Sequence, residues 1–106
     1  FNNNFQTKSI KCQTFNSLLE PTKYKNQKID FLNIDVEGAE MKVLNNLDFG
    51  IYDPEVLCIE ILGYRHLSSL ERENAIKLNK IYRFLVNKNY KKVWSGPSYS
   101  SHIFVK

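Results

Sequence analysis

The sequence predicts an α/β domain in which parallel strands form an open sheet with helices on both faces and an antiparallel strand at the end. Residues 29–36 and 56–62 are nearly continuous apolar runs, as expected of strands buried on both faces. Between them, residues 38–46 repeat apolar side chains with a helical period. This strand–helix–strand order implies parallel pairing with a right-handed crossover.

The segment before the first apolar run predicts a strand and a short helix. Residues 7–15 alternate weakly between polar and apolar side chains, which favours a half-buried strand. Residues 16–20 then favour one helical turn, capped by Asn16 or Ser17 and stopped by Pro21.

The last third of the chain predicts a long helix and two strands. A helix is expected over residues 69–89 because apolar side chains recur there with the spacing of one buried face: Leu78, Ile81, Tyr82 and Leu85. Strands are expected over residues 90–94 and 102–105, joined by a loop around Gly96. Because this loop is too short for a crossover, the two strands should pair antiparallel.

Composition favours a single globular domain over residues 1–106, with residues 1–6 frayed. The 106 residues are 42% hydrophobic and 13% aromatic, enough for one modest core. The net charge is +4, and the lysines and arginines are scattered singly. Scattered lysines are typical of a solvated surface, and we therefore expect no nucleic-acid partner.

Cysteine usage and hydropathy favour a cytoplasmic protein with no membrane partner. Cys12 and Cys58 lie far apart and show neither metal spacing nor a CxxC motif, which predicts reduced thiols and no metal site. No apolar run approaches the roughly 18 residues of a membrane span, and no signal peptide is recognisable. The chain begins without a Met, so we expect it to be part of a longer protein.

Acidic residues follow the first apolar run directly. Asp35 and Glu37 occupy the turn, and Glu40 lies in the first turn of the next helix. Ligands of open α/β sheets bind beyond the carboxyl ends of the strands, so acids there are candidates for chemistry. The alternative for Asp35 is that it caps the helix through the Gly38 and Ala39 amides. For Glu40 we favour a structural role as a negative charge at the helix N-terminus.

Residues 29–44, IDFLNIDVEGAEMKVL, resemble the signature of FkbM-type S-adenosylmethionine-dependent methyltransferases. That family carries a near-identical D-(apolar)2-K-I-D-V-E-G-A-E-x-x-V-L run at its fourth core strand. Residues 11–19 are similar to the V-x-T-L-D-S-L-L run just upstream of it. Weaker similarities to the fifth strand and the tail follow in the right order, at residues 54–61, 84–90 and 102–105. The family has a Rossmann-like, class I methyltransferase fold.

The resemblance implies O-methyl transfer from S-adenosyl-L-methionine to a hydroxyl group of a small molecule or sugar. It places Asp35 and Glu37 beside the methyl group of the cofactor, as catalytic candidates, with Asp35 also contacting the cofactor. Asp35 would orient or deprotonate the acceptor hydroxyl, or help hold a metal ion that does so.

Three further residues are candidates for substrate binding. Glu60 lies at the end of the second apolar run, where a buried, unpaired carboxylate would be costly. It is either a wall of the acceptor pocket or a paired structural acid. His66 and His102 could contact the acceptor, although a lone loop histidine is more often simply solvated.

The chain departs from the family pattern at three places. Asn33 replaces the usual Lys, and Asn16 the usual Asp. The acid-x-G-A-N-x-G loop that holds the cofactor is missing, because the four glycines are isolated. The chain therefore looks like the carboxyl-terminal half of a methyltransferase domain. By itself we expect it to be inactive and to self-associate through the exposed edge of the 29–36 strand.

Two other functions stay open. The absent glycine-rich loop favours a non-catalytic α/β interaction module that kept the scaffold. Only the positive charge suggests a nucleic-acid-binding function, which would be recognised by a steep decrease of binding affinity with salt concentration.

Overall fold

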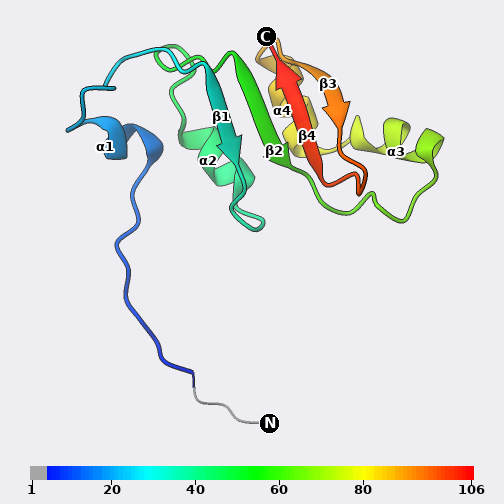
Figure 1. Cartoon of the computed structure of the whole chain (residues 1–106), viewed down its shortest axis with the longest axis horizontal. Helices are drawn as coiled ribbons and strands as arrows, with labels where there is room; N and C mark the ends of the chain where they lie inside the picture. Colours follow the sequence, from blue (N-terminus) through cyan, green and yellow to red (C-terminus); the bar gives the residue numbers. More distant parts are fainter. Residues whose placement is uncertain (1–4) are drawn as a thin grey trace.

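The computed structural model describes residues 5–106, which form one four-stranded sheet with four helices (Figure 1). In chain order the elements are α1 (Phe15–Leu19), β1 (Phe31–Ile34), α2 (Glu40–Asn46), β2 (Val56–Glu60), α3 (Ser69–Ile76), α4 (Lys80–Asn87), β3 (Lys91–Ser95) and β4 (Ser101–Val105). Residues 1–4 lie outside the described residues, and with them most of the segment 1–6 that was expected to fray.

The sheet is mixed, with the strand order β1-β2-β4-β3. β1 and β2 pair in parallel, and β4 pairs antiparallel with both β2 and β3. The predicted parallel unit and the predicted antiparallel ending are therefore confirmed. Because β4 folds back beside β2, the edge strands of the sheet are β1 and β3.

One face of the sheet carries the hydrophobic core. The register aligns Leu32 with Leu57, and Leu57 with Phe104, so these side chains share a face. Leu44 of α2 and Leu85 of α4 belong to the same buried cluster, and the two helices contact each other. Figure 1 shows both helices behind the sheet.

The prediction of helices on both faces is wrong for residues 5–106. The opposite face is covered by no helix of this range, and Phe31 of β1 is 56% exposed on it. Val56 and Cys58 are half-buried there, and Asn33 is exposed. β1 is therefore not buried on both faces as predicted. A strand is buried on both faces only where other elements of the fold cover both faces of its sheet.

The segment before α1 also differs from the prediction. Residues 7–14 are exposed and pair with no strand of the described sheet. Thr14, rather than Asn16 or Ser17, caps α1 by accepting a hydrogen bond from the Ser17 amide at 3.1 Å. Asn16 instead accepts one from the amide of Asp48 at 3.2 Å.

The single helix predicted over residues 69–89 is two helices, α3 and α4. Asn79 separates them because its side chain accepts a hydrogen bond from the Ile81 amide at 2.8 Å and so starts a new helix. Leu78, expected on the buried face, lies in the break and is 78% exposed. Within residues 5–106, no helix is long and apolar enough to span a bilayer.

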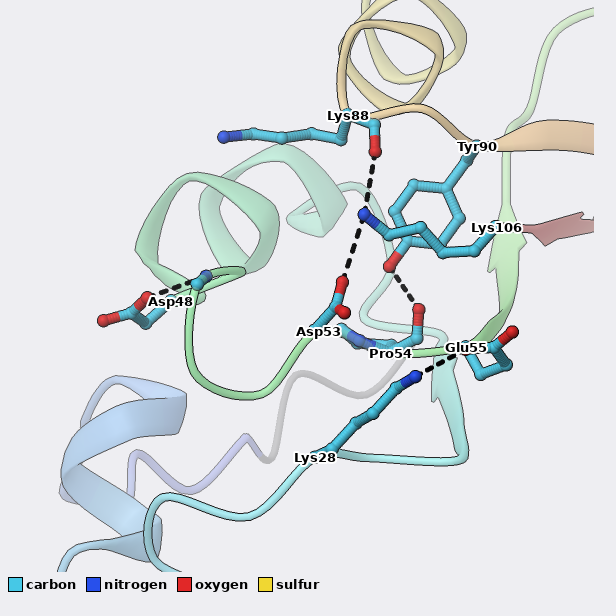
Figure 2. A network of polar contacts seen from close by, with 9 residues as sticks. Lys28, Asp48, Asp53, Pro54, Glu55, Lys88, Tyr90 and Lys106 are labelled. Carbon is cyan, nitrogen blue, oxygen red and sulfur yellow. Dashed lines mark hydrogen bonds and ion pairs between the residues drawn. The ribbon is translucent and has the colours of Figure 1, made fainter.

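Polar contacts tie together the end of the sheet at which β1 and β2 begin (Figure 2). Lys106 Nζ lies 3.0 Å from Asp53 Oδ1 and donates to the Lys88 carbonyl at 3.0 Å. The Tyr90 hydroxyl donates to the carbonyl of Pro54, and burial raises the pKa of Tyr90 to about 12. The carboxyl ends of β1 and β2, where ligands of open α/β sheets bind, lie at the opposite end of the sheet.

Candidate functional site

The candidate site lies where β1 and β2 end. Parallel pairing aligns Ile34 with Ile59, so Asp35, directly after β1, and Glu60, the last residue of β2, lie side by side at this end of the sheet. One carboxylate oxygen from each of Asp35, Glu37 and Glu60 lies within 4.8 Å of the other two. The structure thus brings together three of the predicted residues from two strand ends. Oxygen ligands at this spacing suit a cation.

The turn after β1 has a conformation that positions Glu37. Glu37 has φ = 50° and Gly38 has φ = 95°, both in the left-handed region. Gly38 adopts it without penalty because it has no Cβ, whereas Glu37 must be held there by its surroundings.

Glu40 supplies this support. Its side chain is buried, and its two oxygens accept hydrogen bonds from the Val36 amide at 3.0 Å and the Gly38 amide at 3.1 Å. The Glu40 carboxylate, at the start of α2, therefore holds the backbone of residues 36–38 in this turn. This agrees with the expected structural role for Glu40 and adds a hydrogen-bonding role that the helix-dipole argument did not include.

The alternative role of Asp35 as a helix cap is not supported. The Gly38 amide donates to Glu40, and the Ala39 amide donates to the Val36 carbonyl at 3.2 Å. Both amides assigned to Asp35 under that alternative are thus used elsewhere. Asp35 is exposed and remains free to meet a ligand.

Glu60 is the acid of the site whose pKa is shifted from its ordinary value. Burial and the neighbouring carboxylates of Asp35, Glu37 and Glu40 raise its pKa. Its Oε1 atom is buried and has no hydrogen-bond partner among the described residues. The paired structural acid, one of its two predicted roles, therefore finds no partner here. A protonated donor or a bound cation would relieve the repulsion among the three carboxylates.

The two histidines occupy different surroundings. His66 is exposed in the loop before α3. His102 is fully buried on the helix-covered face, with its Nδ1 2.8 Å from Ser95 Oγ and its ring against Tyr99. Burial is the main cause that lowers the pKa of His102. Acceptor contact stays a prediction for both, and the position of His102 in the core weighs against it.

An apolar cavity of about 580 Å³ lies close to the acids and was not expected from the sequence. Its walls come from the segment before α1, from α1, from the edge of β1 and from α2, and they include Asn33, Val36 and Ala39 beside Asp35. No local sequence signal could identify it, because its walls come from two separate stretches of the chain, residues 12–18 and 32–46.

The comparisons with known proteins agree with the resemblance. The model of the methyltransferase FkbM domain family matches residues 1–92. No curated protein and no solved structure matches the chain significantly.

Proposed function

The chain belongs to the FkbM methyltransferase family, and we propose that it forms part of an enzyme that methylates a hydroxyl oxygen of a small molecule or sugar. The observation that carries this proposal is the meeting of Asp35, Glu37 and Glu60 at the carboxyl ends of two parallel strands. Ligands of open α/β sheets bind at that place.

S-adenosyl-L-methionine, when bound, supplies an electrophilic methyl group on a cationic sulfonium. Carboxylate oxygens suit a cation. Asp35 and Glu37 are both exposed, and Asp35 follows β1 directly. The four glycines are isolated in sequence, so we propose that a glycine-rich cofactor loop comes from sequence outside these 106 residues.

Asp35 has the role of positioning the acceptor. Its carboxylate would orient the acceptor hydroxyl and accept its proton, while the bound cofactor would supply the methyl group. Glu37 orients the same hydroxyl from the turn, and Glu60 forms the wall beside it. The raised pKa of Glu60 favours its protonated form, in which it donates a hydrogen bond without adding a third negative charge.

The test is Asp35→Asn in the full-length protein, with Asp30→Asn as the matched control. Both aspartates are exposed and flank β1, but Asp30 lies at the opposite end of the strand. We expect methyl transfer to fall by roughly 100-fold or more in Asp35→Asn, because a positioned base contributes about 10²–10⁴-fold. Asp30→Asn should retain turnover. Near-normal turnover of a folded Asp35→Asn protein would remove the chemical role of Asp35.

Two further measurements separate the alternatives. If the full-length protein fails to bind S-adenosyl-L-methionine in calorimetry, the non-catalytic interaction module is favoured. If a chelator abolishes turnover and added Mg²⁺ restores it, the carboxylates act through a cation rather than directly on the acceptor.

A further inference from the structure

A second, polar cavity of about 420 Å³ lies between α3 and β3. Ser95, at the end of β3, pairs with His102, which pairs with Ile59. The cavity is therefore at the same end of the sheet as Glu60. Because Lys92 and Ser95 pair with the inward-facing Phe104 and His102, the cavity belongs to the helix-covered face and is distinct from the carboxylate site.

Lys92 places a largely buried cation in this cavity. Its side chain is 12% exposed, and its Nζ forms a salt bridge with Glu73, 3.4 Å from Oε2, and donates to Oε1 at 3.4 Å. Lys92 Nζ also donates to Ser95 Oγ at 2.8 Å. Ser95 Oγ also forms a hydrogen bond with His102 Nδ1 at 2.8 Å. The hydroxyl therefore fixes the ammonium without neutralising it.

Arg72 adds a second cation. The guanidinium lies 5.4 Å from the centre of the Tyr99 ring, and Lys92 lies 5.6 Å from the same centre. Arg72 Nη2 donates to the Arg65 carbonyl, while the buried Nε has no partner among the described residues. Two cations thus lie against one aromatic ring, with hydrogen-bond donors in excess.

A single carboxylate, that of Glu73, opposes these two cations among the residues that line the cavity. It is already engaged, because it pairs with Lys92 and its Oε1 also accepts a hydrogen bond from the Tyr99 hydroxyl at 2.7 Å, which leaves no lining carboxylate for Arg72. The bond from Tyr99 is the main cause that lowers the pKa of Glu73, so the carboxylate is ionised at neutral pH. The lining therefore has a net charge of +1 and a shortage of acceptors. Cations withdrawn from water are costly unless they are paired.

We propose that this cavity binds the oxyanion group, a carboxylate or a phosphate, of a small ligand. Lys92 and Arg72 supply the charge, and the partly exposed Trp94 forms the adjacent wall. An ammonium acts as a point charge, and a guanidinium presents several donors, so an oxyanion fits both.

The test is titration of the protein with sodium phosphate and, separately, with acetate, at constant ionic strength set with sodium chloride. The readout is the indole N–H resonance of Trp94, assigned with Trp94→Phe. We expect a saturable shift with at least one of the two anions, and the tighter one identifies the preferred group. A resonance that responds to neither anion more than to chloride would overturn the proposal.

Three variants make the test specific. Lys92→Gln should weaken binding by about tenfold or more, since hydrogen bonds to charged groups are the strong ones. Lys91→Gln removes the same charge from the neighbouring, exposed position of β3 and should leave affinity within about twofold. Glu73→Gln removes the opposing charge and should tighten binding. Equal effects of the two lysine variants, or no tightening in Glu73→Gln, would each contradict the site, even if Lys92→Gln proved unstable.

Discussion

Glu60 shows at the scale of one residue how burial and charge conflict. Its Oε1 is buried without a partner, and three carboxylates surround it. Because these causes raise its pKa in the folded protein above the unfolded value, the folded state binds a proton there more tightly than the unfolded state. The ionised group therefore lowers the free energy of unfolding at pH values above its folded pKa, and that penalty disappears as the pH falls below its unfolded pKa.

Glu60→Gln should accordingly stabilise the protein at pH 8. The urea midpoint of the variant should lie above that of the natural chain at pH 8, and the difference should shrink as the pH falls toward 4. Paired urea titrations at several pH values measure this. A difference that does not change with pH would show that the charge of Glu60 is not the cause.

At the scale of the element, the two edge strands of the sheet differ in protection. β3 carries Lys91 and Lys92 and a register irregularity between Lys92 and Trp94, which are features that discourage pairing with another chain. β1 has the sequence FLNI, with no charge and no recorded irregularity, and exposes Phe31. The free edge of β1 is therefore the better surface for self-association.

We expect the chain to self-associate through β1, and Phe31→Lys to reduce it. A charge on an edge strand opposes pairing between copies, since like charges would meet there. Val93→Lys is the matched control, because Val93 is similarly exposed, at 52%, on the edge strand β3. Light scattering over a range of concentrations compares the three proteins. A stable monomer at high concentration would contradict the prediction, as would equal effects of the two substitutions.

At the scale of the whole molecule, the polar contacts in Figure 2 join segments that are distant in sequence. Lys106 bridges Asp53 and the Lys88 carbonyl, and its Nζ lies 4.9 Å from the centre of the Tyr90 ring. The Lys28–Glu55 ion pair at the same end, with an Nζ–Oε2 distance of 2.7 Å, has both side chains about half exposed. The two lysines therefore differ in burial and in the number of partners.

Lys106→Ala should destabilise the fold by about 1 kcal/mol, because it removes several partly buried contacts at once. Lys28→Ala should cost clearly less than Lys106→Ala, because a single solvent-exposed ion pair contributes little to stability. Denaturant unfolding of both variants measures the comparison. If both substitutions lower the free energy of unfolding equally, the additional contacts of Lys106 do not contribute to stability.

The sequence by itself determined the strand–helix–strand unit around Asp35, the antiparallel ending and the family. Each depends on signals that are local in the chain: the two apolar runs, the short loop around Gly96 and the IDVEGAE motif. Such signals can be interpreted from the sequence because hydrophobic periodicity and turn chemistry depend on a few neighbouring residues.

Only the tertiary structure decided which residues meet. It placed Glu60 beside Asp35, because the register of β1 on β2 aligns their ends. It gave the Gly38 amide to Glu40, divided the long helix at Asn79 and left one face of the sheet open. It also assembled Arg72, Lys92 and Glu73 around one cavity. These outcomes depend on packing between segments far apart in sequence, and that packing cannot be predicted from periodicity or composition.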